Sequence, residues 1–431
     1  MVKYTHETQS IRQRRMALVV RGYKTELDLN NEQRTACLKH AGCARFAYNW
    51  GLARSQEVYR ATGKRPNALQ LHRALNALKK TDFPWMYEVS KCAPQEALRD
   101  LDRAFAHFFR RLELRKQGKL TGKLGFPRFR KKSRGIGSFR LTGHIHVFED
   151  RIQLPRLGRL RLKECGYLPA GAKVLSATVS EEAGRWYVSV LVEEDQEAVP
   201  CTARTAVGVD LGVNRLATLS DGTTFQNPRP LKQAQKRLRR LEREKARRLI
   251  GSKNRKKTVR KLAKQHVRVA RIRRDATHKL TTHLCKNHAL VAIEDLHVTG
   301  MLKNHRLAQA LADSNFGEIR RQLEDKAKRY GTWLVVIDRF FPSSKRCAAC
   351  GYIKPALGLH ERTFVCEACG VVLDRDQNAA LNVLQEALRT TGSSSGSHAC
   401  GQGSSGRLTG GGEPALAEAG TSHCLGSVLD G

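Results

Sequence analysis

The sequence predicts a multidomain α+β protein: an antiparallel β-barrel with an inserted helical domain, followed by an α/β core with an inserted zinc ribbon. Three observations lead to this fold class. The apolar pattern changes along the chain from strand-like to helical, back to strand-like, and then to mixed α/β. Two Cys-x-x-Cys pairs stand fifteen residues apart near the C-terminal end. The chain is also long for one domain, with 431 residues.

The charge is strongly one-sided. Lys and Arg total 78 against 40 acidic residues, for a net charge of +38. Such an excess favours a polyanionic partner, nucleic acid before an anionic membrane surface. No apolar run approaches the roughly 18 residues of a spanning helix, and the N-terminus lacks the apolar stretch of a signal peptide. We therefore expect a cytoplasmic protein with no membrane partner.

The first part of the chain reads as a strand followed by helices. Residues 17–29 alternate in part, as a strand does. Asn30 or Asn31 can cap the helix that follows, and Gly63 can end it. Two more apolar patterns of helical period follow, so residues 30–116 read as a small helical domain.

A basic, Gly-rich segment comes next, at residues 115–142. Its aromatic residues alternate with cations, which suits contact with a phosphate backbone together with stacking on bases. The candidate contacts are Arg128, Arg130 and Lys131. The alternative is a solvated loop whose Phe126 and Phe129 pack into the core, and the sequence does not choose between the two.

Short alternating runs over residues 138–195 predict an antiparallel β-unit. We expect a barrel that also takes in the strand near residue 20, which makes the helical domain an insertion. From Ala206 the pattern becomes α/β, with strand, tight turn and strand up to Leu219. Further strands are expected at 290–294 and 333–337.

Residues 231–280 read as long helices that are broken near Gly251. They hold 21 Lys or Arg against three acidic residues. A charge run is often only a solvated helix face, but this concentration favours nucleic-acid contact.

The four cysteines of the two pairs are Cys347, Cys350, Cys366 and Cys369. The spacing C-x2-C-x15-C-x2-C is typical of a zinc ribbon. Four thiolates complete the coordination of one Zn²⁺ and leave no open position for catalysis. The zinc ion is therefore expected to serve folding, with nucleic-acid contact as a secondary possibility.

Three acidic residues stand where charge is costly: Asp210 interrupts an apolar strand, Glu294 ends another, and Asp376 starts a helix. Each alone has a structural explanation, and Asp374 is a plausible helix cap. Together, in a basic chain, they follow the order in which an RNase H-like nuclease core presents its metal ligands. Buried carboxylates need a compensating cation, and two Mg²⁺ ions supply one in phosphodiester hydrolysis.

These residues resemble the TnpB family, the transposon-encoded RNA-guided DNA nucleases related to compact type V CRISPR effectors. The resemblance covers most of residues 17–388, and its C-terminal motifs are the more specific ones. The matching stretches are Arg45–Trp50 (RFAYNW), Gln95–Leu98 (QEAL) with Leu101 and Asp102, Gly208–Gly212 (GVDLG), Ile293–Leu296 (IEDL) with Gly300 and Met301, Phe316–Glu318 (FGE) with Arg321–Leu323 (RQL), Pro342–Ser344 (PSS) and Asp374–Ala380 (DRDQNAA).

The resemblance implies a split RuvC-type nuclease with catalytic Asp210, Glu294 and Asp376, which hold two Mg²⁺ ions. Position in the Asp-x-Asn-Ala-Ala element selects Asp376 over Asp374, a choice that the residues alone leave open. The family also implies a guide RNA from the transposon end, double-stranded target DNA with a short adjacent motif, and one protomer per RNA in a prokaryotic, nucleoid-associated setting. The candidate motif readers are Tyr48, Lys91 and Gln95.

The expected domain layout follows from the patterns and the resemblance. In chain order it is 1–29, first part of the wedge-like β-barrel; 30–137, helical recognition domain with the basic loop; 138–200, rest of the barrel; 201–340, RuvC-like core with the basic arm 231–280; 341–372, zinc ribbon; 373–389, last RuvC segment; and 390–431, disordered Gly/Ser-rich tail.

Two other functions stay open at this point. An RNA-guided repressor would hold DNA without cutting it, and relatives of that kind usually lose an acidic residue. A transposase or resolvase would join or exchange DNA ends through the same RNase H-like fold. All three acidic residues are present here, which argues for cleavage.

Overall fold

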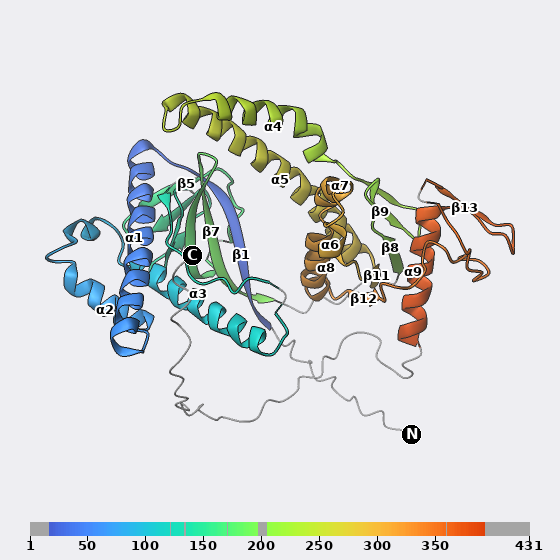
Figure 1. The fold of residues 1–431 in the computed structure, drawn as a ribbon, viewed down its shortest axis with the longest axis horizontal. Helices are drawn as coiled ribbons and strands as arrows, with labels where there is room; N and C mark the ends of the chain where they lie inside the picture. The colour runs from blue at the N-terminus through green and yellow to red at the C-terminus, as the bar shows by residue number, and fades with distance from the viewer. Residues whose placement is uncertain are drawn as a thin grey trace, which may run out of the picture.

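The computed structural model describes residues 17–120, 122–132, 135–169, 171–196, 205–358 and 360–392. The first lobe holds the described residues up to 196 and the second lobe those from 205, with a long helical pair reaching from the second lobe toward the first (Figure 1). The tail predicted to be disordered lies outside the described residues from 393 onward, as do residues 1–16.

The first lobe is built on a seven-stranded antiparallel sheet of order β2-β6-β7-β1-β5-β4-β3. The strand expected near residue 20 does join it: β1 lies between β7 and β5. The strands are β1 (Ala17–Asp28), β2 (Ser138–Leu141), β3 (His146–Val147), β4 (Arg151–Leu154), β5 (Gly158–Leu162), β6 (Lys173–Glu182) and β7 (Arg185–Gln196).

The closed barrel predicted from the sequence is wrong for the described residues, where the sheet is open with β2 and β3 as its edges. Both edge strands are short, four and two residues. Helices of the same lobe contact β2. Short edge strands leave few backbone groups unpaired, so the sheet does not need to close.

Three helices pack with this sheet: α1 (Asn31–Thr62), α2 (Ala68–Leu78) and α3 (Cys92–Lys116), with a short 3₁₀ turn at Pro84–Glu88. The sequence signals for α1 are confirmed. The Asn30 side chain accepts from the Gln33 amide at 2.8 Å, and Gly63 ends the helix in the left-handed region. Helices and sheet share one hydrophobic core.

The second lobe contains a five-stranded mixed sheet of order β10-β9-β8-β11-β12. β8, β11 and β12 are parallel, while β9 and β10 run antiparallel to their neighbours. This arrangement fits the predicted RuvC-like core. The strands are β8 (Ala206–Asp210), β9 (Arg215–Leu219), β10 (Thr224–Gln226), β11 (Leu290–Glu294) and β12 (Trp333–Ile337).

Helices cover both faces of this sheet. On one face Val291 and Ile293 pack with α5 (Lys253–Asn287) and α8 (Phe316–Tyr330). On the other face Leu290 and Ala292 pack against α9 (Arg375–Gly392). Because a parallel strand is buried on both faces, β11 reads as a continuous apolar run that ends in a carboxylate.

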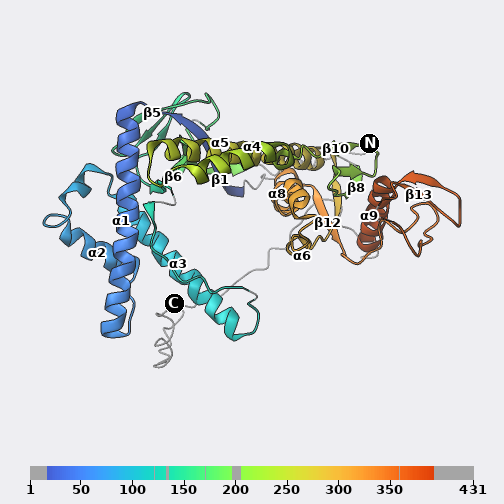
Figure 2. The same ribbon diagram turned by 45° about the horizontal axis from the view of Figure 1, so that its top comes forward.

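The basic residues 231–280 lie in the helical pair α4 (Pro230–Arg247) and α5, which we call the basic arm. Two views show the arm extending from the second lobe to the sheet of the first lobe (Figures 1 and 2). There Arg271 of α5 donates to the hydroxyl of Tyr187 on β7. The remaining elements are α6 (Val298–Met301), α7 (Ala308–Ser314), β13 (Thr363–Val365) and β14 (Val372–Asp374).

Candidate active site and metal centre

The strand register brings two of the predicted carboxylates together. Ile293 of β11 is paired with Val209 of β8, so Glu294 and Asp210 follow at the next position of two parallel strands. Alternate residues of a strand face the same side. Asp210 therefore shares a side with Gly208, and Glu294 with Ala292, which is the side that α9 covers.

Helix α9 brings the third carboxylate to the same place. It begins at Arg375, so Asp376 lies in its first turn. The helix approaches β8 closely because Gly208 has no side chain. A Cβ at this position would collide with the carbonyl oxygen of Ala380 and lie 2.7 Å from the amide nitrogen of Leu384. This glycine thus determines how near α9 and its Asp376 come to Asp210.

Gly208→Ala should lower both stability and activity. The added methyl group meets helix backbone, so α9 must shift, and such overpacking costs about 1–3 kcal/mol. A misplacement of roughly 1 Å at a catalytic centre costs about a hundredfold in rate. Thermal denaturation and a DNA-cleavage assay would measure the two effects. Gly22→Ala is the matched control, since a Cβ at this β1 glycine meets no atom within 4 Å; equal effects of both substitutions would contradict this role.

The structure separates the roles of the two aspartates that the residues alone did not distinguish. Asp374 caps α9: its Oδ1 accepts the amides of Asp376 and Gln377 at 3.0 and 3.2 Å. Its Oδ2 accepts from Arg215 at 3.0 Å. Both oxygens of Asp374 are thus engaged in holding the helix. Asp376 lies 4.0 Å from the same guanidinium, and its carboxylate stays available to a ligand.

The electrostatics of the three carboxylates are those of a site that needs a cation. Burial, together with the charges of Glu294 and Asp376, raises the pKa of Asp210 to about 8, although Arg375 opposes the shift. Burial also raises the pKa of Glu294, while a hydrogen bond from Ser343 opposes that shift. Like charges in a partly dry site repel one another. An oxygen-rich donor set of this kind fits a hard divalent cation such as Mg²⁺.

The four predicted cysteines come together in a second cluster. Their sulfur atoms all lie within 4.8 Å of one another. The second pair lies in the turn between β13 and β14, and Phe364 of β13 is fully buried beside Cys347 and Cys366. One tetrahedral ion fits such a set of four thiolates. The cluster is joined directly to the carboxylates, because β14 ends at Asp374 and α9 follows without a loop.

The predicted nucleic-acid contacts of the first lobe lie on α1, at the start of α3 and on the basic loop. Lys91 is exposed at the start of α3, and Gln95 is half-buried one turn later. Tyr48 is 5% exposed, because the Arg130 guanidinium covers its ring at 3.8 Å. A nucleic acid would reach Tyr48 only if Arg130 moved.

Arg130 itself is held in a defined place. Its backbone N–H and C=O bond the side chain of Asn49 on α1, at 2.7 and 3.0 Å. Arg128 and Lys131 on either side are exposed. The predicted packing of Phe126 into the core is confirmed only in part: the ring packs edge-on against Phe108, yet 41% of it stays exposed. The proposed contacts remain predictions.

The basic arm is fastened to the second lobe by Asp313 of α7, which is 3% exposed. Its carboxylate accepts the amides of Leu231 and Lys232 in the first turn of α4, at 2.9 and 3.1 Å. It also pairs with Arg273 of α5 at 2.8 Å. One carboxylate thus compensates the positive end of α4 and ties both arm helices to the core.

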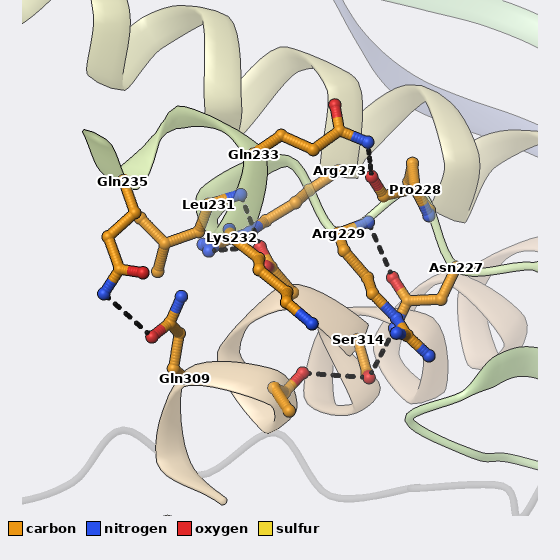
Figure 3. Close-up of polar contacts among 12 residues, drawn as sticks. Asn227, Pro228, Arg229, Leu231, Lys232, Gln233, Gln235, Arg273, Gln309 and Ser314 are labelled. Carbon is orange, nitrogen blue, oxygen red and sulfur yellow. Dashed lines mark hydrogen bonds and ion pairs between the residues drawn. The ribbon is translucent and has the colours of Figure 1, made fainter. Parts of the chain in front are cut away.

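Neighbouring polar contacts complete this junction (Figure 3). Asn227 donates to Ser314 at 3.1 Å and accepts the amide of Arg229. Gln235 of α4 donates to Gln309 of α7 at 3.3 Å. The orientation of the basic arm is therefore fixed at its base by hydrogen bonds from several elements.

Asp313→Ala should destabilise the second lobe by about 3–5 kcal/mol, since it removes the buried acceptor of the first α4 amides and leaves the partly buried Arg273 without its counter-ion. Chemical denaturation would measure the change. The matched control is Asp325→Ala on the adjacent α8, where an exposed pair with Arg329 contributes at most about 1 kcal/mol. If both substitutions changed the unfolding free energy equally, Asp313 would not anchor the arm.

Sequence reasoning missed several residues that shape the site: Gly208, Arg215, Asp313 and Ser343. Gly208 and Ser343 stood within motifs of the resemblance, but their contacts span 172 and 49 positions of the chain. Asp313 gave one usable signal, because it is the only charged residue in the stretch from 307 to 317. No periodic pattern marks Arg215.

Three family models match the chain. The model described as "Probable transposase" covers residues 187–305, the Cas12f1-like TNB domain covers 316–383, and a helix-turn-helix domain covers 16–64. Within the last range the described residues form β1 and the single helix α1 as far as Thr62. The first two models include all three predicted carboxylates.

Known proteins match as well. A protein of Streptomyces pristinaespiralis, named as an RNA-guided DNA endonuclease, is 37% identical over 392 residues, covering 90% of this chain and 92% of that protein. TnpB-like protein L79 of Acanthamoeba polyphaga mimivirus is 32% identical over 146 residues, 32% of this chain and 28% of that protein. A solved structure of CasPhi-2 (Cas12j) bound to crRNA overlaps with a TM-score of 0.40 at 10% identity, over 86% of this chain and 98% of that one.

Among the described helices none is long and apolar enough to cross a membrane.

Proposed function

The chain belongs to the TnpB family, and we propose that it is the RNA-guided double-stranded DNA endonuclease of an insertion-sequence element. The observation that supports this most is the meeting of Asp210, Glu294 and Asp376 from three separate segments at one end of the RNase H-like sheet. A protein that only bound DNA would have no need for three mutually repelling carboxylates.

The three carboxylates would hold two Mg²⁺ ions. When bound, such a pair activates water and stabilises the attacking and leaving oxygens of phosphodiester hydrolysis. Asp210 and Glu294 supply oxygens from adjacent strands, and Asp376 supplies oxygens from the helix above them. Asp374 and Arg215 keep the start of α9 in place. The Ser343 hydroxyl orients the Glu294 carboxylate.

The four cysteines would hold one structural Zn²⁺ ion. Their thiolates converge from two Cys-x-x-Cys turns, and no further chain ligand is needed. We assign this ion to folding of the ribbon, which leads directly into α9.

The nucleic acids would occupy the basic surfaces. The arm, with 21 cations in fifty residues, extends from the site toward the first lobe and offers a path for phosphate backbones. A guide RNA derived from the transposon end would read the target by base pairing, while Lys91, Gln95, Arg128, Arg130 and Lys131 contact the adjacent motif or backbone. We propose one protomer per RNA, acting on DNA in a prokaryotic cytoplasm and associated with the nucleoid.

The experiment that tests this function starts from expression with the native flanking DNA. RNA that co-purifies with the protein is sequenced, and the complex meets a plasmid library with a matching target and randomised flanks, in Mg²⁺ or EDTA. The proposal expects one discrete RNA and Mg²⁺-dependent cutting beside one enriched motif. Target binding without cutting would indicate a repressor instead. A folded protein without RNA that gives strand-transfer products would indicate a transposase.

A further inference from the structure

The chain between β12 and the first cysteine pair is bonded to two of the three carboxylate-bearing elements. The Ser343 hydroxyl donates to Glu294 Oε1 at the end of β11. The carbonyl oxygen of the same Ser343 accepts from Asn382 Nδ2 of α9 at 2.8 Å. One residue therefore joins the strand that ends in Glu294 to the helix that carries Asp376.

Two amides on the inner side of α9 hold the backbone on either side of Cys347. Asn378 and Asn382 stand four residues apart, on one face of the helix, and both are fully buried. Their Nδ2 atoms donate to the carbonyl oxygen of Arg346 at 2.7 and 2.6 Å. Asn378 Oδ1 accepts the amide of Ala348 at 2.9 Å.

Such a pair of buried amides is costly unless it serves a specific geometry. Asn is a poor helix former, and a buried amide gains little over an apolar residue of similar volume. Leucine at both positions could fill the same volume beside the segment 343–348, but it would leave the carbonyl oxygen of Arg346 and the amide of Ala348 without these partners. The hydrogen bonds of Asn378 and Asn382 are directional. They therefore fix both the distance and the rotation of α9 relative to the first Cys-x-x-Cys turn.

We propose that Ser343, Asn378 and Asn382 are positioning residues that make the cysteine cluster part of the catalytic machinery. We call these three residues, with the backbone of Arg346 and Ala348, the knuckle clamp. It fixes Glu294 and Asp376 relative to each other through the first Cys-x-x-Cys turn. The second Cys-x-x-Cys turn is connected to Asp376 through β14 and Asp374. An ion held by the four thiolates would therefore link the two turns, and with them the segments that position Glu294 and Asp376. This inference rests on the proposed nuclease function.

Ser343→Ala isolates the clamp from the fold, since it removes one hydroxyl and leaves every bond of the two asparagines in place. Loss of a side chain that orients a metal ligand typically costs about 10–100-fold in metal affinity or activity. We expect a 10–100-fold lower kcat with an unchanged KM for guided DNA, and a higher Mg²⁺ concentration for half-maximal cutting. Asn378→Leu should give the same pattern. Ser344→Ala is the control, because the neighbouring hydroxyl that it removes takes part in none of the hydrogen bonds of the clamp.

Three further measurements separate positioning from mere stability: melting temperature, zinc content and affinity for the guided target. The inference requires all three to stay near wild type in Ser343→Ala. Unchanged kcat and Mg²⁺ dependence would overturn it, and so would a loss of cutting matched by equal losses of zinc and melting temperature. Mn²⁺ binding to the protein without RNA or DNA, followed by electron paramagnetic resonance, tests the clamp independently of the proposed nuclease function. If the wild-type protein cut no guided target, the proposed function would be wrong. Weaker Mn²⁺ binding by Ser343→Ala would then still support the clamp. Unchanged Mn²⁺ binding would overturn the clamp.

Discussion

Asp210→Ala should abolish DNA cleavage while guide and target binding persist. Asp210 is central to the site, with Glu294 on the adjacent strand and Asp376 above it. Loss of its carboxylate would remove one of the three residues that would hold the predicted Mg²⁺ ions. We expect a rate at least about a thousandfold lower, or roughly 4 kcal/mol of transition-state stabilisation. Cleavage kinetics and gel-shift binding of the guided target measure the two effects.

The substitution should not destabilise the fold. Burial and two neighbouring negative charges raise the pKa of Asp210 to about 8, so in the metal-free protein its ionised form is a strained group. The melting temperature of the metal-free variant should therefore equal or exceed that of wild type. Asp221→Ala, in the exposed turn between β9 and β10, is the control and should cut like wild type. Cutting by Asp210→Ala at the wild-type rate would show that the three carboxylates are not the catalytic site.

Cys366→Ser should release the predicted zinc ion and, with it, nuclease activity. Cys366 is buried in the small core of the ribbon with Phe364. Zinc binding contributes on the order of 10–16 kcal/mol to the folding of small zinc modules, and the ribbon has little other core. Since β14 continues into Asp374 and α9, unfolding of the ribbon would displace Asp376. Metal analysis and cleavage assays follow the two losses together.

Cys165→Ser provides the control for this change, because this exposed cysteine belongs to the first lobe and lies outside the cluster. It should retain both zinc and activity. Guide binding by the first lobe and arm should survive in Cys366→Ser. A variant that lost its zinc yet cut DNA at the wild-type rate would show that the ribbon does not support the active site.

Much of this architecture follows from local patterns. The helix caps at Asn30 and Gly63, the strand at 333–337 and the break near Gly251 are fixed by neighbouring residues. Cysteine spacing and the apolar strands ending in acidic residues are equally local. Such signals need no knowledge of what packs against them.

The features that sequence could not supply depend on contacts between distant segments. The sheet of the first lobe is open with the short strands β2 and β3 at its edges, and no pattern within the strands shows this. The capping role of Asp374, which supports the prediction of Asp376 as the metal ligand, is visible only in the structure. Gly208 and Asp313 are explained only by the backbone and cation that pack against them.

The most direct test of the account is whether the cut site follows the RNA and needs a divalent cation. The guide segment of the co-purifying RNA is replaced, and plasmids carrying either the old or the new target, each beside the enriched motif, are incubated with the complex in Mg²⁺ or EDTA. The account predicts that cutting moves to the new target, occurs only in Mg²⁺ and disappears in Asp210→Ala. Cutting that stays at the old target, or that continues in EDTA, would contradict it.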